Sequence, residues 1–200
     1  MSGGLARAVS CKAMRLIPIL TAAAILACTA APAVAQDASL FGYFKAVCAP
    51  GTDPDAGAAR ALAQGFAPAK KKPKMGELDD VKGFEKTVGG RDFFVVVGRG
   101  KGKAKDGMPP SATTACGVGV KGKDETGLAA GRKWVGVPSS KTVMGIAFHA
   151  FRQSGGARAA LSFDDKAAVK AALLAADLNV LTITGLGGNS LLLLTRTRPA

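Results

Sequence analysis

The chain has 200 residues, with 27 Lys and Arg against 14 Asp and Glu, and a formal net charge of +13 at pH 7. Its length excludes a large multidomain enzyme. An apolar fraction of 48% and a charged fraction of 20% argue against intrinsic disorder, and no strict glycine repeat or heptad series indicates a fibre.

Residues 1–35 have the three parts of a secretory signal peptide. Basic residues without any acid precede the apolar run 16–28, which is short for a membrane span, and small residues follow at Ala33 and Ala35. We therefore expect cleavage after Ala35, a periplasmic or secreted protein, and no transmembrane helix in the mature chain. The alternative is a lipoprotein acylated at Cys28, which is disfavoured because a bulky leucine stands two residues before it.

Such cleavage leaves two cysteines, Cys48 and Cys116, in a compartment that permits disulfides. A structural metal site needs more Cys or His ligands than this chain has, and a catalytic thiol needs a histidine base. We predict a disulfide between Cys48 and Cys116 and no metal site.

Residues 36–66 are predicted to form a helical hairpin. Apolar residues at helical spacing place the first helix over 39–48. A second helix, capped by Asp53 or Asp55, runs on to Phe66. Its expected inward face carries Ala59, Leu62 and Phe66.

Residues 67–92 are basic and interrupted by proline, and are expected to be a linker to a sheet with helices over 93–200. The predicted strands are 93–97, 113–120, 142–151, 157–163, 180–184 and 191–198, and the predicted helices are 124–134 and 165–178, the latter capped by Ser162 or Asp164. Because consecutive hairpins pair antiparallel, we predict one α+β domain over 36–200. Its sheet is mainly antiparallel, with helices packed on one face.

The candidate catalytic motifs in this sequence are incomplete. Residues 117–123 match a phosphate-loop pattern, but Asp124 stands where such a loop needs Ser or Thr, and 26 glycines make chance matches easy. His149 is the only histidine, so it cannot form a zinc site alone, and no G-x-S-x-G motif accompanies it. We predict no catalytic residue and no cofactor.

Two basic clusters are the strongest functional signal. They comprise Lys70, Lys71, Lys72 and Lys74, and then Arg99, Lys101, Lys103 and Lys105. In the second cluster glycines separate the cations, which suits contact with anionic groups by charge rather than by shape. Neither cluster contains the aromatic residues that stack on bases, so no nucleic acid is expected as a partner.

The main hypothesis is a non-catalytic binding or accessory protein of the bacterial envelope that contacts anionic lipid or polymer through these lysines. The alternative is a basic surface that has no specific partner and only maintains solubility. The second hypothesis is a chaperone-like or inhibitor-like partner of another exported protein, which would use the sheet face or an apolar groove near Trp134 and Phe148. A hydrolase that uses His149 is a distant third.

Three segments carry a resemblance: SLFGYFKAVC at 39–48, ARALAQGF at 59–66 and ACGVGV at 115–120. In these the chain resembles small, uncharacterised exported proteins of Gram-negative bacteria, over about half of the mature chain. The resemblance implies a periplasmic or envelope protein with a Cys48–Cys116 pairing, and it transfers no catalytic residue.

Overall fold

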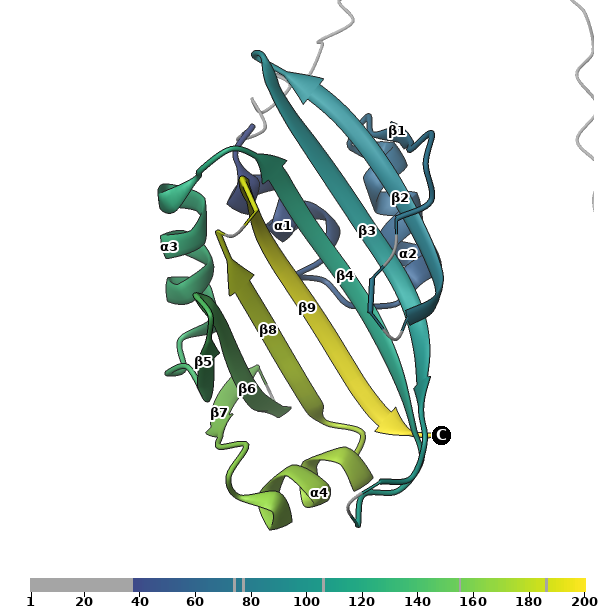
Figure 1. Ribbon diagram of the computed structural model, residues 1–200, viewed down its shortest axis with the longest axis vertical. Coiled ribbons are helices and arrows are strands. Elements are labelled where there is room, and N and C mark those ends of the chain that lie inside the picture. The colour runs from purple at the N-terminus through teal and green to yellow at the C-terminus, as the bar shows by residue number, and fades with distance from the viewer. Residues whose placement is uncertain (1–37, 74, 77, 106, 155, 186) are drawn as a thin grey trace, which may run out of the picture. The chain divides into compact units, whose positions relative to one another are not determined.

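A computed structural model describes residues 38–200 except 74, 77, 106, 155 and 186 (Figure 1). The signal-peptide and lipoprotein predictions therefore fall outside the described residues. In chain order the elements are α1 (Leu40–Val47), α2 (Pro54–Ala63), β1 (Ala67–Pro68), β2 (Leu78–Val88), β3 (Arg91–Gly102), β4 (Ser111–Lys121), α3 (Glu125–Val135), β5 (Lys141–Val143), β6 (Ile146–Ser154), β7 (Ala157–Leu161), α4 (Lys166–Leu174), β8 (Leu178–Thr184) and β9 (Asn189–Pro199).

The described strands form one antiparallel sheet in the order β1-β2-β3-β4-β9-β8-β6-β5, with β7 paired to β6. The α+β architecture predicted from the sequence is confirmed. Neighbouring strands are mostly hairpin partners, but β9 lies between β4 and β8 (Figure 1). The last strand therefore joins the two halves of the sheet, and it brings the C-terminal residues beside the β3–β4 hairpin.

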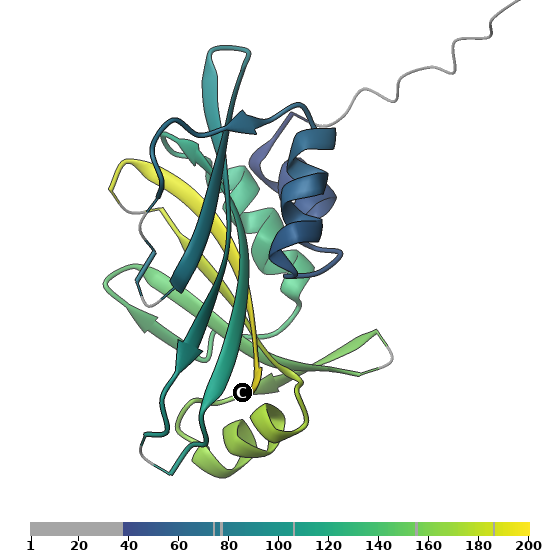
Figure 2. The ribbon, with the colours of Figure 1, turned by 90° about the vertical axis from the view of Figure 1, so that its right-hand side faces the viewer.

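Helices α1, α2 and α3 lie against one face of the sheet (Figure 2). Alternate residues of the central strands point to this face, as the pleat of a strand requires. Helix α1 begins at the cap Ser39, whose side chain accepts from the Gly42 N–H, and it buries the aromatic ring of Phe44 completely. The fully buried strand residues beneath the helices include Val95, Val97, Val118, Val120, Leu181 and Leu192.

The predicted disulfide is present between Cys48 and Cys116. Cys48 ends α1 and Cys116 lies in the middle of β4, so the bond links the helical layer to the centre of the sheet. Both residues are fully buried. Helix α2 crosses beside the bond at Gly57, where a Cβ atom would lie 2.9 Å from Cγ1 of Val97.

The predicted linker over 67–92 is wrong for most of its length, because it contains β1 and β2. Strand β2 pairs with β3 from Asp80 opposite Arg99 to Val88 opposite Arg91. Its alternating pattern is obscured because its two buried residues, Val81 and Phe84, are three positions apart. The positions between and around them are largely charged.

Helix α2 buries Pro54, Gly57 and Ala61 rather than the predicted Ala59 and Leu62, and Leu62 is 51% exposed. Small residues four positions apart let this helix approach the sheet closely, which larger apolar residues would prevent. Of the predicted inward residues Phe66 is buried, but it follows the end of the helix.

Helix α4 is shorter than predicted and is capped by Asp165, which accepts from the Ala168 N–H, rather than by Ser162 or Asp164. It ends before Ala176, which has a φ of 54° and leads directly into β8. Its buried residues Ala172 and Leu173 pack in a second, smaller cluster with Leu178. This cluster lies apart from the core beneath α1, α2 and α3.

Asp124 makes the start of α3 sensitive to acid. Its carboxylate accepts from the Gly127 N–H and from Nη2 of Arg91, both at 2.8 Å. Burial alone would raise the pKa of Asp124, but these hydrogen bonds and the Arg91 charge outweigh it and hold the pKa below its usual range. The carboxylate therefore stabilises the fold above the unfolded-state pKa, and this contribution is lost as the pH falls through the folded-state pKa.

We expect Asp124→Asn to lower the free energy of unfolding by about 1 kcal/mol at neutral pH, because asparagine keeps the cap but not the charge. Below about pH 4 the difference from the wild type should shrink towards zero. Urea unfolding at both pH values measures it, with the exposed Asp79→Asn as a control for loss of one charge. A difference that persists unchanged in acid would contradict the assigned ion pair.

Candidate functional site

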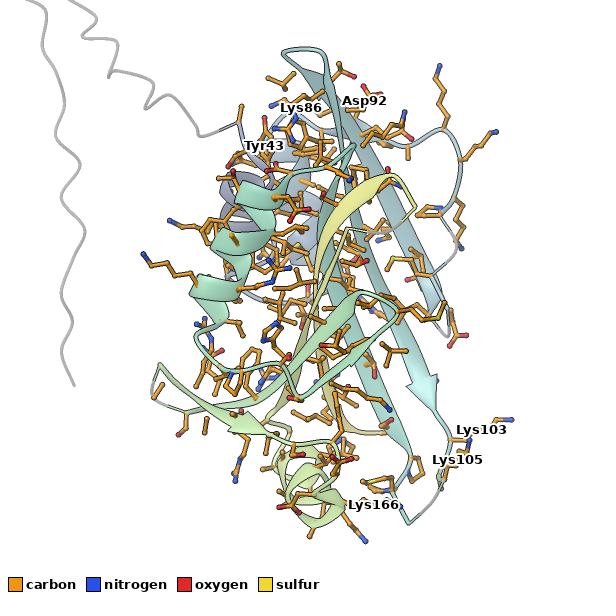
Figure 3. The ribbon with its side chains drawn as sticks, turned by 60° about the vertical axis from the view of Figure 1, so that its left-hand side comes forward. Tyr43, Lys86, Asp92, Lys103, Lys105 and Lys166 are labelled. Atoms are coloured by element: carbon orange, nitrogen blue, oxygen red, sulfur yellow. A yellow bond between two sulfur atoms is a disulfide. The ribbon has the colours of Figure 1, made fainter. Side chains whose placement is uncertain are left out.

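Basic side chains gather at one end of the sheet, which we name the basic end. It comprises Lys101, Lys103 and Lys105 of β3 and the connection to β4, Lys166 and Lys170 of α4, and Arg196 and Arg198 of β9. Figure 3 shows Lys103, Lys105 and Lys166 at this end and Lys86 and Asp92 at the other. The sheet register places Lys101 and Arg198 on either side of Ala112.

The charges of the basic end are not balanced locally. Within the described part of the chain, no acidic side chain forms an ion pair with any of its seven members. The described acids on adjoining segments are Asp164 and Asp165, before α4, and Asp177, before β8, and the seven cations outnumber them. Asp165 caps α4, and Asp177 accepts from Nε of Arg152 and from the Gln153 N–H. The end therefore presents positive charge to solvent.

Apolar groups lie among these cations. A shallow groove of about 460 Å³ separates the tip of the β3–β4 hairpin from α4, and Lys105, Met108, Lys170 and Leu174 line it. The side chain of Leu174 is an exposed large hydrophobe, with 57% of its surface accessible. Among the described residues, no helix combines the length and hydropathy that crossing a membrane requires.

The predicted basic clusters do not form one surface. Lys70, Lys71 and Lys72 are exposed on the segment between β1 and β2, away from the basic end, and Lys74 lies outside the described residues. Arg99 donates to Asp55, which also accepts from Nζ of Lys82 at 2.9 Å. The hydrogen bonds from Lys82 and Arg99 hold the pKa of Asp55 below its usual range.

Sequence reasoning missed four members of the basic end, namely Lys166, Lys170, Arg196 and Arg198. The final strand did carry a signal, because Arg196 and Arg198 alternate with threonines and therefore share one face. Their proximity to Lys101 depends on β9 pairing with β4, which a local pattern does not reveal.

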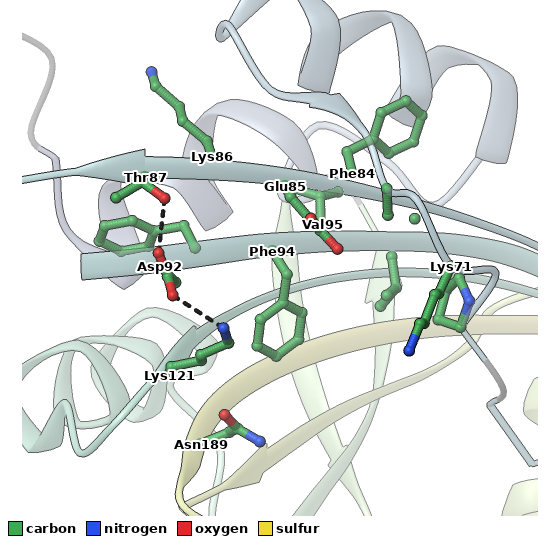
Figure 4. A pocket seen from close by; sticks show the side chains of 15 residues that line it. Lys71, Phe84, Glu85, Lys86, Thr87, Asp92, Phe94, Val95, Lys121 and Asn189 are labelled. Atoms are coloured by element: carbon green, nitrogen blue, oxygen red, sulfur yellow. Dashed lines mark hydrogen bonds and ion pairs between the residues drawn. The ribbon is translucent and has the colours of Figure 1, made fainter. Parts of the chain in front are cut away.

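The face of the sheet opposite α1, α2 and α3 carries a groove, shown in Figure 4. Its volume is about 410 Å³, and an adjoining apolar cavity of about 550 Å³ shares Pro73, Phe94 and Val96 with it. Lys121 pairs with Asp92 at 2.9 Å, and the hydrogen bonds from Thr87 and Lys121 hold the pKa of Asp92 below its usual range. The charges of Lys121 and Asp92, which lie at one end of the groove, therefore largely neutralise one another.

Lys86 is also engaged, because its Nζ donates to the Gln64 carbonyl at 2.7 Å and lies 5.1 Å from the centre of the Tyr43 ring. Figure 4 shows it pointing away from the groove. Lys71 and Glu85 also line the groove, and neither forms an ion pair with a described side chain. Besides Lys86, the lining thus holds one unpaired charge of each sign, whereas the unpaired charges of the basic end are all positive.

Trp134 and Phe148, which were expected beside one apolar groove, face different sides of the sheet. Trp134 packs edge-on against Phe44 in the main core. Phe148 precedes His149 in β6, and His149 is buried beside Leu181, so Phe148 points to the opposite face of the sheet. Nδ1 of His149 lies 2.9 Å from the Val137 carbonyl oxygen, which places this histidine in the packed interior.

Gly117 and Gly119 of the phosphate-loop pattern lie within β4, paired with β3 and β9. Their peptide groups belong to the sheet and are not free to surround a phosphate. Within the described residues, no group of three or more His, Cys, Asp or Glu side chains is placed to hold a metal ion.

The fold and site define an α+β protein whose antiparallel sheet is covered by helices on one face and ends in a cluster of cations that form no ion pair with a described side chain. Comparisons with protein-family models, with curated proteins and with solved structures give no match for this chain.

Proposed function

We propose that the chain is an exported, non-catalytic protein of the bacterial envelope that binds an anionic lipid surface through the basic end. The observation that carries this proposal is the gathering of seven cations that form no ion pair with a described side chain. Two of them, Lys105 and Lys170, line a groove together with the exposed Leu174. The signal-peptide features of residues 1–35 support export to a compartment where such surfaces occur.

The physical argument combines charge and apolar contact. Each Lys or Arg close to an anionic membrane contributes about 1 kcal/mol, and the attraction falls off within a Debye length. Leu174 and Met108 lie between the cations and can enter the headgroup region, as apolar side chains of interfacial proteins do. An anionic polymer would use the lysines but not these apolar groups, which is why a lipid surface is favoured.

The hairpin lysines provide the test. We expect the variant Lys101→Ser, Lys103→Ser, Lys105→Ser to bind equimolar phosphatidylglycerol–phosphatidylcholine vesicles at least about tenfold more weakly than the wild type. Vesicle sedimentation at low and high salt measures this, and wild-type binding should weaken as salt rises. Vesicles of phosphatidylcholine alone should bind little protein.

A matched control variant removes three lysine charges from a segment outside the basic end. The variant Lys70→Ser, Lys71→Ser, Lys72→Ser alters exposed lysines away from the basic end and should change the affinity less than about threefold. Equal losses in the two triple variants would show that net charge acts without a site, and would overturn the proposal. So would the absence of wild-type binding at low salt.

The second hypothesis, a partner of another exported protein, has its support in the apolar cavity lined by Met75, Phe94, Leu191 and Leu193. It predicts association that does not weaken with salt, because apolar docking depends little on ionic strength. The salt series therefore distinguishes the two functions.

A further inference from the structure

A cleft of about 350 Å³ lies at the border of the basic end, between the loop that joins α1 to α2 and strand β9. Its walls are formed by Thr52 and Asp53 of the loop, Thr114 of β4, and Arg196 and Arg198 of β9. The two arginines are two positions apart in one strand, so both point to the same face. Arg196 lies directly opposite Thr114 in the sheet register.

The guanidinium group of Arg196 is held in place. Its Nε and Nη2 donate to the Ala176 carbonyl oxygen at 3.2 and 2.9 Å. Ala176 adopts a φ of 54°, a conformation that few non-glycine residues take. These contacts occupy only part of the donor set of a guanidinium, so Arg196 keeps N–H groups in a fixed orientation for another acceptor.

The neighbouring described acids form no ion pair with the arginines. Asp177 follows Ala176, but its carboxylate is bound by Arg152 and the Gln153 N–H. Asp53 accepts from the Ala56 N–H as the cap of α2. No described side chain forms an ion pair with Arg196 or Arg198.

The opposite wall supplies a hydroxyl donor. Oγ1 of Thr52 and Oγ1 of Thr114 are 2.7 Å apart, and Thr52 is buried. One of these hydroxyls donates to the other, which leaves the second with its proton available. Arg60 fixes this wall, because its Nη2 donates to the Gly51 carbonyl at 2.8 Å. The cleft is therefore formed before any ligand enters.

We infer that this cleft binds the phosphate of a glycerol phosphate group. Two guanidinium forks and a hydroxyl donor match the several oxygen acceptors of a tetrahedral phosphate, whereas a carboxylate has only two oxygens to share among them. The carboxylate of Asp53 stands at the same wall and can accept from a hydroxyl of the glycerol. The inference rests on the proposed function, since it assigns the headgroup that a lipid surface offers to the basic end.

The same chemistry exists in a lipid headgroup and in free glycerol 3-phosphate, so the experiment uses both. The oxidised protein is titrated with glycerol 3-phosphate by calorimetry, and its binding to phosphatidylglycerol vesicles is compared with binding to vesicles of equal charge made with oleate. We expect glycerol 3-phosphate to bind and phosphatidylglycerol to be preferred to oleate. Preference among vesicles without binding of the free compound assigns the cleft to the lipid headgroup alone.

Arg198→Gln is the test variant, because Arg198 has no described hydrogen bond that the fold would lose. We expect it to weaken both glycerol 3-phosphate binding and the preference for phosphatidylglycerol at least about tenfold. Arg132→Gln, an exposed arginine on α3, makes the same chemical change and should alter either quantity less than about threefold. Thr114→Val, which removes one hydroxyl at similar volume, should weaken binding in the same direction as Arg198→Gln.

Failure of this inference and failure of the proposed function are separable. If Arg198→Gln behaves like Arg132→Gln, or if phosphatidylglycerol and oleate vesicles bind equally well, the cleft is not a phosphate site although the basic end still binds charged surfaces. If glycerol 3-phosphate binds with the expected dependence on Arg198 while no vesicle binds, the lipid-surface proposal is wrong and the ligand is a free phosphate ester.

Discussion

Replacing both Cys48 and Cys116 with alanine is expected to lower the free energy of unfolding by about 4 kcal/mol, the largest effect of any change considered for this fold. The bond joins residues 68 positions apart, so its removal restores much conformational freedom to the unfolded chain. Both side chains are fully buried, so truncation also leaves small voids beneath α1 and α2. Urea unfolding of the oxidised wild type and the double variant measures the difference.

Reduction of the wild-type protein gives an independent estimate that introduces no substitution. The reduced protein should unfold at a lower urea concentration than the oxidised protein, by an amount similar to the double variant. Equal midpoints for the oxidised and reduced proteins would contradict a stabilising role for the bond. A double variant that does not fold would agree with the prediction, since a loss of this size is a large part of the stability of a small domain.

The sequence was most informative where local pattern and local contact coincide. Helix α1 follows from its apolar spacing and the Ser39 cap, and the disulfide was predicted from the expected export and the cysteine count. The core strand that contains Val95 and Val97 was predicted because its residues are apolar on both faces.

The second strand of the sheet was missed for a physical reason. Strand β2 lies at the margin of the sheet, where only β1 covers part of its outer edge, so much of its length faces solvent and carries charge. Its register with β3 is also irregular between Leu78 and Asp80, which breaks the period-two pattern. A polar, irregular strand resembles a linker when the sequence alone is considered.

The sequence alone predicted only part of the candidate site. Glycine and lysine composition identified the hairpin lysines, but Arg198 joins them only because β9 inserts between β4 and β8. The cleft beside Arg196 and Arg198 depends in addition on Ala176 and on the loop before α2, which are far apart in the chain. Such long-range pairings come from the packing of the whole sheet.

Helix α3 shows how tertiary packing outweighs intrinsic propensity. Gly127 and Gly131 disfavour a helix by about 1 kcal/mol each. In the structure a Cβ atom at Gly127 would lie 2.8 Å from Cβ of Leu40, and one at Gly131 would lie 2.6 Å from Cδ2 of Leu192. The two glycines therefore let α1 and β9 approach the helix closely, and the burial that results compensates for the poor propensity.

We accordingly expect Gly131→Leu to lower the free energy of unfolding by about 3 kcal/mol, although leucine is the better helix former. The new side chain must displace Leu192, which is fully buried under α3 and has no free space to enter. Ala129→Leu, at an exposed position of the same helix, adds bulk toward solvent and should change stability by less than about 0.5 kcal/mol.

A double-mutant cycle separates this packing conflict from a general loss of helix. Leu192→Ala alone should cost about 3 kcal/mol, but it also removes the atoms that a side chain at position 131 meets. The combination of Gly131→Leu with Leu192→Ala should therefore be more stable than the sum of the two single losses predicts, by about 1 kcal/mol or more. Strict additivity would mean that position 131 and Leu192 do not compete for the same space, and the close approach of α3 to β9 would then need another explanation.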